Sequence, residues 1–121
     1  MLKNDLFTFS DLQEEGNIIR TIIRLNASHP IFAGHFPDQP VLPGACMMQM
    51  AKEVLADYLG KQIKLVSASD LKFLAIVDPT ENNPIQMEIK LVREDGKTRI
   101  DAKLLDKAVV LFKFKGIFVP I

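Results

Sequence analysis

His35 is the residue of this sequence best suited to acid–base chemistry, because it stands in a stiff segment that leads into a helix-forming stretch. Residues 26–43 are apolar, and a continuous helix is excluded there by four prolines, Pro30, Pro37, Pro40 and Pro43. Gly44 follows, and the unpaired N–H groups at a helix N-terminus can stabilise an oxyanion. A stiff loop that holds a histidine at such a place suits catalysis. From these residues alone, a histidine packed under the loop is an equally good interpretation.

The helix that would follow this segment spans residues 44–59, which contain no proline and are rich in Ala, Met and Leu. Gly60 is a natural residue to end it. We expect one broad face of this helix to be buried. It consists of Ala45, Met48, Ala51, Leu55 and Tyr58, and it is extended by Met47, Met50 and Val54. Cys46, in the first turn, is interpreted as a small core residue.

Strands are predicted on both sides of the helix. Residues 6–12 and 18–25 predict a hairpin, and four further strands are expected at residues 63–76, 85–94, 98–106 and 108–119. Asp95-Gly96 is a strong hairpin signal between two of them. The order predicts an α+β fold, in which one buried helix packs against a sheet that ends in an antiparallel meander.

The composition favours one soluble globular domain spanning residues 1–121. The chain has 121 residues, of which 48% are hydrophobic and 25% charged. Fifteen basic residues balance fifteen acidic ones, which excludes a global basic field for nucleic acid.

The residues and segments that the sequence lacks limit both where the protein is expected to be located and which cofactors it is expected to bind. A single cysteine excludes an internal disulfide and a Cys-rich metal site, and we expect neither metal nor cofactor. No apolar run approaches the roughly eighteen residues that a membrane span needs. The first residues have no apolar signal-peptide core, so we expect a cytoplasmic protein.

A motif within the stiff segment points to a family. Residues 34–44 read Gly-His-Phe-Pro-x-x-Pro-Val-Leu-Pro-Gly, which resembles the signature of the 3-hydroxyacyl-acyl-carrier-protein dehydratases. Residues 70–73 also resemble the family's strand after the helix, with Asp78-Pro79 where the family usually has Pro-Gly. The resemblance implies a hot-dog fold, an antiparallel sheet wrapped around one central helix.

The resemblance also implies a reaction, dehydration of a 3-hydroxyacyl thioester to a trans-2-enoyl thioester without a cofactor. His35 would remove the α-proton, and the backbone N–H of Gly44 would polarise the thioester carbonyl. A carboxylate on the central helix of the other subunit would handle the departing hydroxyl. The residues expected to bind the acyl group are Phe36, Pro43, Met48 and Phe73.

The sequence departs from the family at that carboxylate. The family places it fourteen residues after the histidine, which is position 49 here, and position 49 is Gln. An amide cannot donate a proton near neutral pH. Glu53 lies one helical turn further on and Asp38 lies within the motif, but both are expected to be solvated surface charges.

Three functions stay open at this point: an active dehydratase of fatty-acid or related lipid or polyene synthesis, a non-catalytic or partner-dependent subunit that pairs with an active homologue, and a thioesterase. The dehydratase-type loop makes the thioesterase the weakest of them. The family resemblance implies a homodimer or higher homo-oligomer, with a heterodimer as the alternative.

Surface residues are assigned more weakly. The acyl carrier protein would be the partner, and Lys61, Lys64 and Lys72 could face it. His29, outside the motif, is expected to brace the loop.

Overall fold

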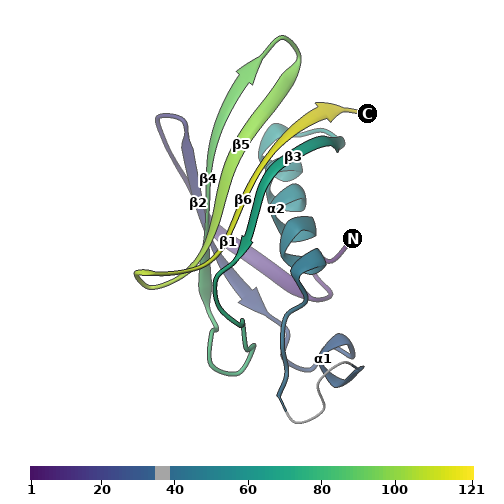
Figure 1. Ribbon diagram of the computed structural model, residues 1–121, viewed down its shortest axis with the longest axis vertical. Helices are drawn as coiled ribbons and strands as arrows, with labels where there is room; N and C mark the ends of the chain where they lie inside the picture. Colours follow the sequence, from purple (N-terminus) through teal and green to yellow (C-terminus); the bar gives the residue numbers. More distant parts are fainter. Residues whose placement is uncertain (35–38) are drawn as a thin grey trace.

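The computed structural model describes residues 1–34 and 39–121. One antiparallel sheet curves around a long helix that lies on its concave side (Figure 1). The strands are β1 (Phe7–Glu15), β2 (Ile18–Leu25), β3 (Ile63–Phe73), β4 (Ile85–Glu94), β5 (Lys97–Asp106) and β6 (Val109–Pro120). The helices are the short α1 (Ile31–Gly34) and the central α2 (Gly44–Leu59). The predicted α+β class is confirmed.

The strands follow the order β1-β2-β4-β5-β6-β3 across the sheet. β4, β5 and β6 form the expected meander, but the position predicted for β3 at its start is wrong. β4 already pairs with β2 on one side and with β5 on the other, so β3 takes the free side of β6 and forms an edge of the sheet. Residues 74–84 then return the chain to the middle of the sheet.

Two strands end three residues away from their predicted ends. β1 continues to Glu15 through a bulge between Ser10 and Gln13, where Asp11 has a positive φ of 58°. β3 ends at Phe73, three residues earlier than expected, and this end of the strand lies beside the start of α2.

Both ends of α2 are as predicted. Pro43 is the N-cap residue in extended conformation, and Gly60 ends the helix with a φ of 71° that glycine adopts without strain. No helix in the described part of the chain is long and apolar enough to cross a membrane.

The buried face of α2 is turned relative to the predicted one. Ala45 is exposed, and Met48 and Tyr58 are only half-buried. The buried residues of the helix are Cys46, Met47, Met50, Ala51, Glu53, Val54 and Leu55. The sheet meets this face with apolar side chains of alternating residues, among them Ile19, Ile23, Met87, Ile89, Phe112, Phe114 and Phe118. The buried face is set by the angle at which the helix crosses the sheet, and helical periodicity does not determine that angle.

Candidate active site

The predicted base, His35, lies outside the described residues, as do Phe36 and Asp38. The site is therefore built from the parts on either side of them, which are the segment that ends at Gly34 and the start of α2.

His29 braces the segment before His35, as predicted. Its Nδ1 accepts a hydrogen bond from the backbone N–H of Ile31 at 3.1 Å. Because Nδ1 is an acceptor, the neutral ring carries its proton on Nε2, which lies 3.2 Å from Oδ2 of Asp5. The imidazole thus ties the start of α1 to the turn before β1.

An apolar groove of about 510 Å³ lies at the N-terminal end of α2. It is lined by Pro43, Gly44, Met47, Phe73 and neighbouring residues on either side. The Phe73 ring lies against Gly44 and stacks on Phe112, with ring centroids 5.3 Å apart. The structure therefore brings together three predicted site residues, Pro43, Gly44 and Phe73. Met48 is not among the groove residues, and Met47 takes the place expected for it.

The backbone N–H of Gly44 is suited to the oxyanion role. Pro43 O accepts the N–H groups of Cys46 and Met47 at 3.0 and 3.3 Å, which closes the first turn. Within residues 1–34 and 39–121, nothing accepts the N–H of Gly44. It remains one of the unpaired donors of a helix N-terminus, beside the apolar groove.

Gln49 and Glu53 form a hydrogen-bonded pair further along α2. Nε2 of Gln49 donates to Oε2 of Glu53 at 2.8 Å. The expectation that Glu53 is a solvated charge is wrong, because its exposed fraction is 6%. The N-terminal segment folds over it, and the N–H groups of Leu2 and Lys3 donate to its carboxylate at 2.8–3.0 Å. Leu2 and Lys3 lie about fifty residues before Glu53 in the sequence, so the spacing of residues along the helix could not reveal this contact.

Gln49 does not face the groove of Gly44. Five residues along an α-helix amount to a rotation of roughly 140°. Gln49 and Glu53 instead border another pocket of about 490 Å³, together with Met1, Lys3, Lys52, Ala56 and residues beyond the end of α2. Within one chain, Gly44, the predicted oxyanion donor, and Gln49 therefore lie on different faces of the helix.

Cys46 fits its prediction as a core residue. It is buried, and burial raises the pKa of its thiol above the ordinary value. A thiol in that state is a poor nucleophile at neutral pH.

Comparisons with known proteins show the family of this chain. Residues 11–113 match a family model described as ApeI-like, the ApeI dehydratases. The chain belongs to the ApeI-like dehydratase family. The family assignment made from the motif is therefore confirmed.

Among curated relatives, the 3-hydroxyacyl-[acyl-carrier-protein] dehydratase FabZ of Shewanella woodyi is 24% identical over 110 residues, covering 79% of this chain and 72% of that protein. FabZ of Klebsiella pneumoniae is 23% identical over 112 residues, covering 81% and 74%.

Solved structures show the same fold. A chain of the dehydratase heterocomplex ApeI:P from Xenorhabdus doucetiae has a TM-score of 0.74 at 18% identity, covering 93% of this chain and 97% of that chain. Cj0977, a sigma28-regulated virulence protein from Campylobacter jejuni, has a TM-score of 0.73 at 14% identity, covering 99% and 88%. The predicted hot-dog fold is confirmed.

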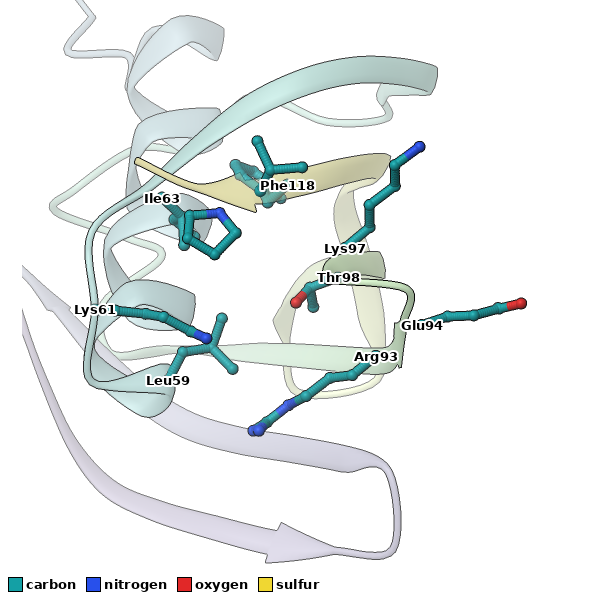
Figure 2. Close-up of a pocket in the computed structure, with 11 residues that line it drawn as sticks. Leu59, Lys61, Ile63, Arg93, Glu94, Lys97, Thr98 and Phe118 are labelled. Atoms are coloured by element: carbon teal, nitrogen blue, oxygen red, sulfur yellow. The ribbon is translucent and has the colours of Figure 1, made fainter.

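The lysines considered for carrier-protein contact do not form one cluster. Lys64 and Lys72 lie on β3, roughly 25 Å apart along the strand. Lys61 lies at the other end of α2 from Gly44, where it lines a small pocket of about 120 Å³ with Arg93 and Lys97 (Figure 2). None of the predicted site residues that the structure describes lines that pocket. In the described residues no three His, Cys, Asp or Glu side chains gather into a metal site.

Proposed function

We propose that this chain dehydrates 3-hydroxyacyl-acyl-carrier-protein thioesters to trans-2-enoyl thioesters in fatty-acid or related lipid or polyene biosynthesis, in the cytoplasm. The observation that carries the proposal is the N–H of Gly44, which has no acceptor among the described residues and lies beside the apolar groove of Pro43 and Phe73. The thioester carbonyl would accept from Gly44, and the acyl chain would lie along Phe73 with Phe36, Pro43 and Met47. The membership of the ApeI-like dehydratase family supports this reaction.

The site is completed across a dimer in this proposal. Gln49 lies on a different face of α2 from Gly44, so a substrate held at Gly44 of one subunit would meet Gln49 of the other. β3 is an edge strand with exposed apolar side chains, which a second copy would cover: Leu65, Val66, Leu71 and Phe73.

The proton balance follows from the chemistry of an amide. His35 removes the α-proton, the C–O bond at the β-carbon breaks, and a carbon–carbon double bond forms. Gln49 cannot supply the proton that the departing hydroxyl needs. The imidazolium of His35 therefore returns the proton to that hydroxyl, which leaves as water, while Gln49 orients it.

A second function is favoured by Gln49 itself. A chain without the helix carboxylate could serve as a partner-dependent subunit that offers its His35 loop to an active homologue. The ApeI:P protein of similar fold is a dehydratase heterocomplex. For this chain, such pairing would leave the homodimer inactive.

Turnover of 3-hydroxyacyl-acyl-carrier-protein by the purified wild type, His35→Ala and Gln49→Glu separates the two functions. Gln13→Glu, which adds the same charge at an exposed position of β1, is the matched control. Wild-type turnover that His35→Ala abolishes supports the dehydratase. No wild-type turnover, with activity appearing in Gln49→Glu but not in Gln13→Glu, would instead identify the pairing subunit.

A further inference from the structure

Glu53 is an unusual carboxylate for a helix surface. Its exposed fraction is 6%. Its two oxygens accept hydrogen bonds from the backbone N–H of Leu2 at 3.0 and 2.9 Å, from that of Lys3 at 2.8 Å, and from Nε2 of Gln49 at 2.8 Å. Every one of these partners is a donor, which is the environment that suits an ionised carboxylate.

The N-terminal segment that supplies two of the donors is itself held in place. Nζ of Lys3 lies 3.2 Å from Oδ1 of Asp57, one turn beyond Glu53 on α2. The same ammonium group lies 4.9 Å from the centroid of the Phe9 ring. Glu53 is therefore clamped between the N-terminal segment and the helix, and its Oε2 presents a fixed acceptor to Gln49.

This fixed acceptor determines which way the Gln49 amide faces. An ionised carboxylate can only accept, so Nε2 of Gln49 must be the atom turned toward it. Oε1 is then the atom that remains for a ligand, and no donor within the described residues reaches it. Without Glu53 the terminal amide would have two orientations of similar energy, because such torsions are broad and roughly two-fold.

We propose that Glu53 is a positioning residue, which fixes the Gln49 amide so that Oε1 accepts a hydrogen bond from the 3-hydroxyl of the substrate. The inference rests on the proposed dehydration. A hydroxyl that donates to Oε1 keeps its own lone pairs open for the proton that makes it a leaving group. A reversed amide would donate to those lone pairs and compete with that proton.

Kinetics of three single variants and one double variant test the role. Glu53→Gln should lower kcat about tenfold, the effect of one charge-assisted hydrogen bond, with little change in KM. Glu94→Gln, the same substitution at an exposed position at the end of β4, is the matched control and should leave both constants unchanged. Gln49→Met, which keeps the shape and removes the amide, should lower kcat, and adding Glu53→Gln to it should have no further effect. Additive losses would overturn the proposal, as would an unchanged kcat in Glu53→Gln.

NMR of the side-chain amides in the wild-type protein tests the orientation independently of turnover and of whether Glu53→Gln folds. In the wild-type protein, the Gln49 carboxamide protons, assigned with Gln49→Met, should exchange slowly with water. The same protons should exchange freely in Glu53→Gln and stay protected in Glu94→Gln. Free exchange in the wild type would overturn the proposal. If the Gln49 protons are protected but the protein shows no turnover, the Glu53–Gln49 geometry is supported and the proposed dehydration is contradicted.

Discussion

Gly44 lies directly against the ring of Phe73, so that a Cβ atom at position 44 would be 2.5 Å from two carbons of that ring. The first turn of α2 and the end of β3 can approach this closely only because residue 44 has no side chain. The contact places the N–H of the predicted oxyanion donor beside the apolar wall of the groove, where water is partly excluded and a hydrogen bond to developing charge is strengthened.

Gly44→Ala should impair binding more than folding. The methyl group would push the exposed Phe73 ring away from Phe112 and reshape the groove, so we expect KM for the acyl thioester to rise about tenfold. The free energy of unfolding should change by about 1 kcal/mol or less, since alanine favours a helix and the ring can move. Steady-state kinetics and chemical denaturation measure both.

Gly60→Ala is the control for this change. It introduces the same methyl group at the other end of α2, where φ is 71°. It should destabilise the protein by about 1 kcal/mol and leave KM unchanged. Equal effects of the two substitutions on KM would contradict the role given to the Gly44–Phe73 contact.

Gln49→Glu should make stability depend on pH. The new carboxyl would lie beside the buried Glu53, and two carboxylates at that distance cannot both stay ionised without a large cost. The folded variant would therefore bind a proton that the unfolded chain releases, so its stability should rise as the pH falls from 8 to 5. Urea denaturation should show a loss of about 2 kcal/mol at pH 8. A constant difference from the wild type across this range would show that the two side chains do not meet.

His29→Ala should loosen the segment that leads to His35. It removes the acceptor of the Ile31 N–H and the partner of Asp5, at 3.1 and 3.2 Å. We expect a loss of about 1–2 kcal/mol in the free energy of unfolding. Asp5→Asn, which keeps an acceptor for Nε2–H, should lose less. A larger loss in Asp5→Asn than in His29→Ala would contradict the brace.

Asp78 should stabilise the turn before β4 except in acid. Its Oδ1 accepts the N–H and the hydroxyl of Thr80 at 2.8 and 2.6 Å, and these bonds lower the pKa of the Asp78 carboxyl. A carboxyl whose pKa is lower in the folded state contributes stability that is present at neutral pH. That contribution is lost as the pH falls through the folded pKa.

Thr80→Val checks this behaviour, because it removes the hydroxyl donor at nearly constant volume. It should therefore be less stable than the wild type at pH 7, and the difference should shrink below pH 4. Denaturation at the two pH values measures it. A difference that grows in acid would show that Asp78 is not the group responsible.

Local patterns in the sequence determined the elements of this protein. The absence of proline from residues 44–59, with Pro43 before and Gly60 after, predicted α2 at both ends because helix limits depend on neighbouring residues. Alternation of side chains predicted β2 and β4 for the same reason. The Gly-His-Phe-Pro motif sufficed for the family because its residues are contiguous in the chain.

Only the tertiary structure decided which elements meet and which side chains they bury. The place of β3 at the sheet edge depends on β4 having both sides occupied. The contact of Gly44 with Phe73 and that of Glu53 with Leu2 join residues distant in sequence. Whether a charge on a helix is solvated or buried depends on what packs over it, and for Glu53 that covering comes from the N-terminal residues. Spacing along a helix carries no information about such a partner.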